Sequence, residues 1–287
     1  MCIRWVEPIA AHCTLGRALG VGGFATVHDA VCRATGAPLA VKVLSKRRNP
    51  TWRREVEAMA AIQHRAVVPL LAASEDSGSA YLVMPRYQDC DLLDVAQTES
   101  LGTERALDYA EQMLEALQAV HSAGLAHLDV KPDNFCVGPD GRIVLVDLGS
   151  AAPLSREEPD EMCTVDRGSG TAQYMAPELA NDRYNQRTDV WGVGVSVYAM
   201  VTRELPYRMS STPGGPPEYK SMVLSGLADP LEACIARMLE LDARARPTLT
   251  EALALVRASA LAARPAHPGE PADQQAAAQH HPFCLLT

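Results

Sequence analysis

Residues 127–134 read HLDVKPDN, and residues 146–149 read VDLG. Together they bring four polar side chains into one short region: Asp129, Lys131, Asn134 and Asp147. A carboxylate here can orient an attacking hydroxyl and accept its proton, while Lys131 can neutralise a transferring phosphoryl group. Asn134 and Asp147 offer the hard oxygen ligands that Mg²⁺ prefers. Each segment alone is compatible with an ordinary loop, but their order and spacing predict a phosphoryl-transfer site.

A glycine-rich segment, LGVGGFATV, lies nearer the N-terminus between two predicted strands. Glycine has no Cβ, so its backbone N–H groups can approach phosphates closely. A plain glycine hairpin is the alternative, and no helix follows as a dinucleotide-binding fingerprint requires. The segment consists of Leu19, Gly20, Val21, Gly22, Gly23, Phe24, Ala25, Thr26 and Val27.

Lys42 ends an apolar strand, LAVK, that follows the glycine-rich segment. A buried ammonium group must be paired or neutralised. Glu55 lies on the next predicted helix, four residues before Met59, so that the two side chains share one helix face. Glu57 is the second candidate partner, and a lysine exposed at the strand end is the structural alternative.

The N-terminal part of the chain is predicted to be rich in strands. Residues 14–44 alternate β-branched runs with glycines, which predicts three short antiparallel strands. Asn49 and Pro50 predict the N-cap and first position of a helix. Two further strands are predicted at residues 67–73 and 79–84. Beyond residue 85 the apolar periodicity predicts helices at residues 104–122, 189–202, 231–239 and 248–261.

Composition and charge limit the function classes. The 287 residues are 47% apolar and 21% charged, which indicates a folded chain with a sizeable core. The net charge of −9 argues against a nucleic-acid partner, and it divides into +4 over residues 1–84 and −13 over residues 85–287. Eight cysteines without a C-x-x-C pair, and no signal peptide or transmembrane segment, predict an intracellular protein, cytoplasmic or nuclear.

On these segments the chain resembles the eukaryotic-type protein kinase family, serine/threonine class. Three later segments strengthen the resemblance: GTAQYMAPE at 170–178, DVWGVG at 189–194 and RARP at 244–247. It implies an α+β bilobal fold with a small β-rich N-lobe that carries one main helix and a larger, mainly helical C-lobe. The expected domains are an N-terminal extension (1–13), a kinase domain (14–259, with lobes 14–84 and 85–259) and a disordered tail (260–287).

The resemblance also implies ATP and Mg²⁺ as cofactors and assigns roles to residues. Asp129 would be the base, Lys131 would act beside it, and Asn134 and Asp147 would bind the metal. Lys42 would hold the ATP phosphates and pair with Glu55. The glycine-rich segment would cover the nucleotide, together with Ala40, Met84 as gatekeeper, Tyr87 in the hinge and Asp91 at the ribose. Met59, Leu70, His127 and Leu148 would form a hydrophobic column, Glu178 would pair with Arg246, and Asp189 would cap the catalytic loop.

Three positions depart from the family pattern: Ala25, Leu148 and Leu128. Leu128 matters most, because the arginine usual at this position receives a phosphate on the activation segment. The expected function is therefore a serine/threonine protein kinase that does not strictly depend on activation-segment phosphorylation. A pseudokinase acting as a binding or regulatory module is the alternative.

Partners follow from the same resemblance. Lys131 followed by Pro132, and the Gly170-Thr171 pair, favour protein substrates with Ser or Thr acceptors. Three acidic side chains favour substrates with basic residues near the acceptor: Asp89, Asp91 and Asp94. Membrane attachment is expected only if Cys284, in a C-terminal CLLT, or Cys2 is lipidated. The oligomeric state is left open.

Overall fold

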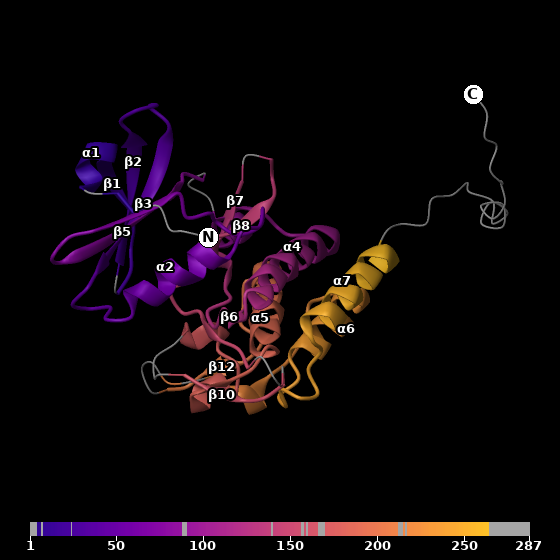
Figure 1. Ribbon diagram of the computed structural model, residues 1–287. Helices are drawn as coiled ribbons and strands as arrows, with labels where there is room; N and C mark the ends of the chain where they lie inside the picture. The colour runs from indigo at the N-terminus through magenta and orange to yellow at the C-terminus, as the bar shows by residue number, and fades with distance from the viewer. Residues whose placement is uncertain are drawn as a thin grey trace, which may run out of the picture.

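A five-stranded antiparallel sheet forms the N-lobe of the computed structural model, with strand order β1-β2-β3-β5-β4 (Figure 1). The strands are β1 (Cys13–Val21), β2 (Ala25–Cys32), β3 (Pro38–Ser45), β4 (Ala72–Glu75) and β5 (Ser79–Pro85). The structure describes all residues except 1–4, 7, 24, 88–90, 139, 156–157, 159, 166–169, 212–214, 216 and 264–287. The three strands predicted within residues 14–44 are confirmed.

The register of this sheet gathers several predicted nucleotide-contacting residues on one face. Val27 lies opposite Lys42, and Ala40 lies opposite Met84. Side chains two residues apart on a strand, and side chains directly opposite on neighbouring strands, point to the same face. Val27, Ala40, Lys42 and Met84 therefore share one face of the sheet.

The helix α2 (Trp52–Ala61) begins later than the sequence predicts, and Thr51 rather than Asn49 is its N-cap. Asn49 Oδ1 accepts hydrogen bonds from the backbone N (3.2 Å) and Oγ1 (3.0 Å) of Thr51. The asparagine thus stabilises the turn before the helix instead of its first turn. The buried face of α2 includes Trp52, Glu55, Val56 and Met59, as the spacing predicts.

The strand predicted at residues 67–73 is wrong for most of its length, because β4 begins only at Ala72. Val67 and Val68 are buried, and the backbone here pairs with β8 (Ile143–Leu145). Val68 N donates to Leu145 O (2.9 Å), and Leu145 N donates to Ala66 O (2.9 Å). This apolar run therefore joins the two lobes instead of extending the N-lobe sheet.

Residues of the expected N-terminal extension pack on the N-lobe. Val6 N donates to Ala73 O (2.8 Å), so the chain adds a parallel bridge at the edge of the sheet beside β4. Trp5 contacts the first residue of α2, with its ring centroid 6.3 Å from that of Trp52 in an edge-to-face arrangement. A one-turn helix, α1 (Ile9–His12), then leads into β1, which starts at Cys13.

The C-lobe is built on α4 (Thr103–Ser122) and α5 (Thr188–Thr202), with α6 (Asp229–Met238) and α7 (Leu249–Ala263) packed beside them (Figure 1). These four helices confirm the predicted ones to within a few residues. The sequence did not predict α3 (Leu92–Thr98), which a reciprocal capping box of Asp91 and Asp94 begins. Helix α7 runs to Ala263, so residues 260–263 of the expected tail are helical, and the rest of the tail lies outside the described residues.

Short elements complete the C-lobe. The small strands are β6 (Leu125–Ala126), β7 (Phe135–Val137), β8, β9 (Ala152–Pro153), β10 (Cys163–Thr164), β11 (Arg183–Tyr184), β12 (Arg208–Met209) and β13 (Pro217–Glu218). The 3₁₀ turns are η1 (Pro132–Asn134), η2 (Ala172–Tyr174), η3 (Leu179–Asn181) and η4 (Tyr219–Ser221). The β7–β8 hairpin and the β6–β9 pair surround the segments 127–134 and 146–149.

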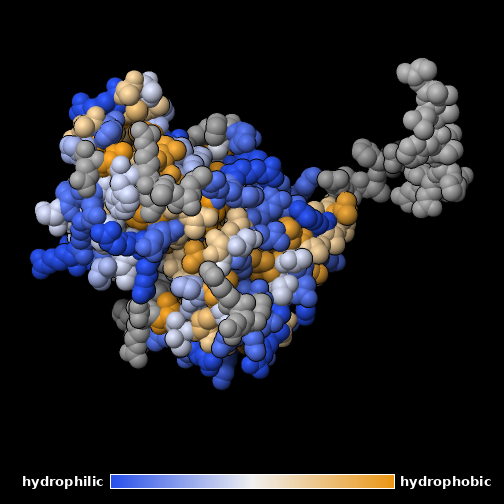
Figure 2. All heavy atoms as spheres, in the orientation of Figure 1, coloured by the Kyte–Doolittle hydropathy of each residue, from blue (hydrophilic) through white to orange (hydrophobic). Residues whose placement is uncertain are grey.

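One hydrophobic core runs through both lobes, from Ala40 in β3 to Val256 in α7. On the face drawn in Figure 2 the described residues are mostly hydrophilic, with smaller hydrophobic areas between them. Helix α5 is buried along nearly its whole length, which explains why its sequence is apolar on every side. No helix in the described part of the chain combines the length and apolar character needed to cross a membrane.

Gly192 in α5 lets the loop of residues 127–134, the catalytic loop of the resemblance, pack directly on this helix. A Cβ at this position would lie 2.6 Å from Val130 Cβ and 3.0 Å from Val130 O. We expect Gly192→Ala to lower the free energy of unfolding by about 1–3 kcal/mol, the usual cost of overpacking. This cost exceeds the gain of at most about 1 kcal/mol from alanine's higher helix propensity. Urea denaturation measures the change.

Gly102→Ala is the matched control, because a Cβ at Gly102 meets no atom within 4 Å. We expect this variant to unfold at a urea concentration close to that of the wild type. Equal stability of the Gly192 and Gly102 variants would contradict the close contact between α5 and Val130.

Candidate active site

Lys42 lies at the centre of a charge cluster between the lobes, in which Lys42 and Glu55 are buried and the Asp147 side chain is 41% exposed. Its Nζ donates to Glu55 Oε1 (2.6 Å) and to Asp147 Oδ1 (2.9 Å). Lys42 and Glu55 are only 7% and 3% exposed. The second candidate, Glu57, is exposed on the other side of α2. The partner of Lys42 is therefore Glu55, and the structure adds Asp147, whose contact with Lys42 spans 105 residues of sequence.

The charges on Lys42 and Asp147 stabilise each other, while burial and the like charge of Asp147 raise the pKa of Glu55. Burial acts against the charge on Lys42, but Asp147 and Glu55 outweigh it and raise the pKa of the lysine. Burial likewise acts to raise the pKa of Asp147, but Lys42 and the backbone N–H of Gly149 lower that pKa to about 2. Lys42 and Asp147 are therefore both charged at neutral pH.

The catalytic loop brings Asp129, Lys131 and Asn134 together. Asn134 Nδ2 donates to the backbone O (2.7 Å) and to Oδ2 (3.3 Å) of Asp129. Lys131 Nζ lies 3.2 Å from Asp129 Oδ2 and donates to Thr171 Oγ1 (2.7 Å). Within the described residues, Asp129 Oδ1 is buried and has no hydrogen-bond partner. One oxygen of this carboxylate is thus held by neighbours, while the other can accept a proton.

Asp189 at the start of α5 fixes the other end of this loop. Its two carboxylate oxygens accept hydrogen bonds from the backbone N of His127 (2.8 Å) and of Leu128 (2.8 Å). Burial would raise the pKa of Asp189, but hydrogen bonding to His121 and the nearby histidine rings lower it. The capping role that the resemblance implies for Asp189 has a direct geometric basis.

Leu128 adopts a left-handed backbone conformation, with φ of 64°. This costs a residue other than glycine on the order of 1–3 kcal/mol and persists only where the surroundings enforce it. The two bonds to Asp189 enforce it here. The Leu128 side chain is 3% exposed and packs in the core, in the position where the family usually presents an arginine.

The glycine-rich segment forms the hairpin between β1 and β2, with Gly20 opposite Val27 and Val21 opposite Thr26. Gly20 and Gly23 have no left-handed backbone, and a Cβ on either would meet no atom within 4 Å. The chain's own conformation and packing therefore do not require glycine at these positions. Close approach of the backbone to a ligand does explain them. Phe24 lies outside the described residues.

The remaining predicted nucleotide contacts lie at the lobe boundary. Ala40 and Met84 are buried, and Leu19, Ala25, Thr26, Val27 and Tyr87 are half-buried. Asp91 also begins a helix, because its Oδ1 accepts from Asp94 N (2.9 Å) as the N-cap of α3, and its contact with a ribose stays a prediction. Burial raises the pKa of Asp91. Its carboxylate already serves a structural role, which the sequence did not reveal.

The predicted hydrophobic column also meets in the core. Met59, His127 and Leu148 are at most 2% exposed, and Leu70 is partly buried against the same cluster. The ring of His127 forms a hydrogen bond of 2.6 Å through Nε2 with the backbone O of Asp147. This bond ties the catalytic loop to the segment 146–149.

Asn134 and Asp147 fit a magnesium site. Val146 N donates to Asn134 O (2.9 Å), so the β7–β8 hairpin sets the two residues side by side. Asp147 uses Oδ1 for its bonds to Lys42 and Gly149, which leaves Oδ2 for a cation. The described residues hold no group of three or more His, Cys, Asp or Glu arranged around a metal. Two oxygen ligands agree with Mg²⁺ chemistry, because this ion keeps several waters and binds substrate phosphates as well.

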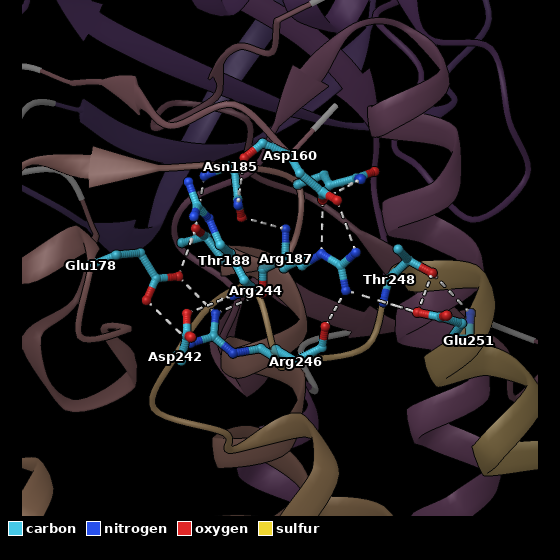
Figure 3. Close-up of polar contacts among 11 residues, drawn as sticks. Asp160, Glu178, Asn185, Arg187, Thr188, Asp242, Arg244, Arg246, Thr248 and Glu251 are labelled. Atoms are coloured by element: carbon cyan, nitrogen blue, oxygen red, sulfur yellow. Dashed lines mark hydrogen bonds and ion pairs between the residues drawn. The ribbon is translucent and has the colours of Figure 1, made fainter. Parts of the chain in front are cut away.

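A second polar network lies below the site and is drawn in Figure 3. Arg246 is fully buried, and its Nη1 and Nη2 donate to Glu178 Oε1 (2.7 Å) and Oε2 (3.1 Å). The Arg246 guanidinium carbon lies 5.1 Å from the ring centroid of Trp191. This ion pair, which the resemblance implies, anchors the end of the activation segment to the C-lobe.

Sequence reasoning missed three polar contacts of the activation segment. These are Lys131 with Thr171, Gly149 N with Asp147 Oδ1, and Asp160 with Arg187. The sequence marks Thr171 as a substrate-class residue and a possible phosphorylation site, but it does not pair Thr171 with Lys131. No local sequence signal pairs Asp160 with Arg187, because the two residues are 27 positions apart.

The bilobal fold, the cluster of Lys42, Glu55 and Asp147 between the lobes, and the loop 127–134 that carries Asp129 together define a protein kinase. The family model described as protein kinase domain matches residues 13–256, and the chain belongs to this family. It is 30% identical over 247 residues to "Serine/threonine-protein kinase PEPKR2" of Arabidopsis thaliana, covering 83% of this chain and 51% of the relative.

Two further relatives show how the similarity is distributed. "Calcium-dependent protein kinase 9" of rice, Oryza sativa subsp. japonica, is 32% identical over 261 residues, or 83% of this chain and 44% of the relative. "Serine/threonine-protein kinase RAD53" of Saccharomyces cerevisiae is 32% identical over 214 residues, or 67% and 26%. The chain thus spans about half the length, or less, of these curated relatives.

Proposed function

We propose that this chain is a serine/threonine protein kinase, which transfers the γ-phosphoryl group of ATP to Ser or Thr hydroxyls of protein substrates. The observation that carries the proposal is the buried Lys42, bonded to both Glu55 and Asp147, together with Asp129 Oδ1, which has no partner among the described residues. A buried carboxylate oxygen without a partner is costly to a fold, and a substrate hydroxyl would satisfy it.

The chain's own residues account for the transfer. The substrate hydroxyl donates its hydrogen bond to Asp129 Oδ1, and its proton passes to this carboxylate as the oxygen attacks the γ-phosphorus and ADP leaves. Asn134 Nδ2 holds Asp129 in place, and Lys131 Nζ supplies positive charge beside it. Lys42 holds the ATP phosphates. Mg²⁺, held by Asn134 and Asp147, would supply further neutralisation of the phosphate charge.

The substrate class is supported by the relatives and by the Lys131–Thr171 contact. Two of the three relatives described above carry serine/threonine-protein kinase in their names. Lys131 Nζ donates to Thr171 Oγ1 at 2.7 Å, so the two class-marking residues form one surface beside Asp129. This surface is where we place the acceptor Ser or Thr.

We further propose that activity does not strictly require phosphorylation of the activation segment. Leu128 has no charge, and its side chain is buried in the core, so it cannot bind a phosphate on that segment. Lys42 and Glu55 pair directly through their side chains, and Asp147 is the further partner of the lysine.

A preference for basic substrates would depend on acidic side chains near the hinge. Asp94 is exposed, Asp91 caps α3, and Asp89 lies outside the described residues. We therefore propose only that exposed acidic groups near the hinge favour basic residues in the substrate. An intracellular location, and membrane attachment only through a lipid on Cys2 or Cys284, stay proposals from the sequence. Both cysteines lie outside the described residues.

A pseudokinase is the second candidate. A binding module needs none of the four residues Lys42, Asp129, Asn134 and Asp147, yet all four are present and each is bonded within the site. The arrangement therefore favours catalysis over a purely regulatory role.

Transfer of label from γ-³²P-ATP to a generic basic protein tests these proposals. We expect Mg²⁺-dependent labelling of Ser and Thr only, abolished by chelation, with most activity kept after phosphatase treatment of the enzyme. Labelling of tyrosine alone would contradict the substrate class. Loss of activity after phosphatase treatment would contradict phosphorylation independence. Absence of any labelling would leave the pseudokinase.

A further inference from the structure

The activation segment, residues 147–178, is anchored by a carboxylate of its own. Asp160 Oδ1 accepts from Arg187 Nε (2.8 Å), and Asp160 Oδ2 accepts from Arg187 Nη2 (3.0 Å). Gln186 Nε2 donates to the same Oδ1 at 3.0 Å. Arg187 therefore binds the Asp160 carboxylate through two parallel hydrogen bonds, a strong and directional geometry for an arginine–carboxylate pair (Figure 3).

Arg187 is itself part of the rigid base of the C-lobe. It immediately precedes α5, and its side chain is only 14% exposed. Arg187 Nη1 donates to the backbone O of Arg246, and Arg246 Nη1 donates back to the backbone O of Arg187 at 2.9 Å. Arg246 is also bonded to Glu178, the last residue of the activation segment. Arg187, which binds Asp160, therefore belongs to the same polar network as the end of this segment (Figure 3).

The backbone next to Asp160 follows the same course. In the β10–β11 pair, Cys163 lies opposite Tyr184 and Thr164 opposite Arg183, while Val165 N donates to Asp182 O (3.0 Å). Residues 160–165 therefore run antiparallel along residues 182–187. The carboxylate of Asp160 fastens one end of this ladder, and Lys131 with Thr171 fixes the segment again beyond it.

We propose that Asp160 is a positioning residue, which holds the activation segment in its substrate-receiving shape through a permanent contact with Arg187. This contact takes the place of a phosphate bound to the arginine that Leu128 replaces. The inference rests on the proposed kinase function and names how its site is regulated: the anchor is built into the sequence and needs no upstream kinase.

The electrostatics suit a permanent anchor. Hydrogen bonds from Arg187 and Gln186 lower the pKa of Asp160 to about 2, so the group stays charged at neutral pH. The Asp160 side chain is 52% exposed, and solvent therefore screens the pair. An exposed pair with good geometry contributes at the upper end of the range for surface ion pairs, which corresponds to about a 5-fold change in an equilibrium.

Asp160→Asn tests the proposal, since it keeps the shape and removes the charge. We expect amide hydrogen exchange at residues 160–165 to become about 5-fold faster, and the KM for a peptide substrate to rise about 5-fold. The KM for ATP and the urea midpoint of unfolding should stay unchanged. Asp160→Glu, which retains the carboxylate, should recover part of both effects.

Glu158→Gln is the matched control, because it removes a carboxylate from the same turn and leaves Asp160 in place. Wild-type exchange and peptide KM in Asp160→Asn, or equal effects of Asp160→Asn and Glu158→Gln, would overturn the proposal. A lower unfolding midpoint, with both KM values unchanged, would show a purely structural ion pair and overturn it as well. If the wild-type chain transfers no phosphoryl group, the kinase function fails, and hydrogen exchange still decides whether Asp160 anchors the segment.

Discussion

Asp129→Asn is expected to lower turnover by about 10²- to 10⁴-fold, the range that general acid–base catalysis contributes. The amide nearly matches the carboxylate in shape but cannot accept the proton of the substrate hydroxyl. Asn134 and Lys131 contact Asp129 at Oδ2 and at the backbone O, so the loop should keep its geometry in the variant. Labelled ATP with a generic basic protein measures the effect.

The control for this variant is nucleotide binding. In the part of the chain that the structure describes, Lys42 bonds to Glu55 and Asp147 and not to Asp129, so the KM for ATP should be unchanged in Asp129→Asn. Equal turnover of the variant and the wild type would mean that Asp129 is not the base. Equal labelling would also result if a contaminating kinase transferred the phosphoryl group in both samples.

Arg246→Met is expected to lower the free energy of unfolding by about 3–5 kcal/mol, the usual result of removing one partner of a buried ion pair. Arg246 is fully buried, and the Glu178 side chain is only 9% exposed. The variant therefore leaves a carboxylate in the interior with Thr188 Oγ1 as its remaining side-chain donor among the described residues. Urea denaturation measures the loss.

A double variant and a surface control separate charge from packing. Glu178→Gln combined with Arg246→Met removes both charges, so it should be less destabilised than Arg246→Met alone. Arg257→Met removes an exposed arginine that pairs with Glu111 and should change stability little. If Arg246→Met lost no more stability than Arg257→Met, the buried pair would not stabilise the fold as argued.

The polar networks around Lys42 and around Arg246 have different roles in the site. The cluster around Lys42 holds charges where ATP phosphates would bind, and the cluster around Arg246 fixes the segment on which a protein substrate would lie. Asp189 connects them, because it lies in the first turn of α5, two residues after Arg187, and accepts hydrogen bonds from the backbone N of His127 and of Leu128. A change at the start of α5 therefore reaches the loop that carries Asp129.

The amino-acid sequence by itself determined the chemistry of the site. The spacing of Asp129, Asn134 and Asp147 is local, and helical periodicity was enough to place Glu55 beside Met59 on the face that meets Lys42. Strands and helices with a clear period were also correct, since one exposed and one buried face leave a regular pattern in the sequence. The family resemblance followed from these same segments.

Only the tertiary structure decided which polar groups pair over long distances. Nothing local distinguishes Val67 and Val68, which pair with the other lobe, from residues of an N-lobe strand. The bond between Asp160 and Arg187 likewise exists only because β10 folds back along β11. Hydrophobic periodicity reports that a residue is buried, but the partner of a charged group depends on which distant segments meet, and that is fixed only when the whole core packs.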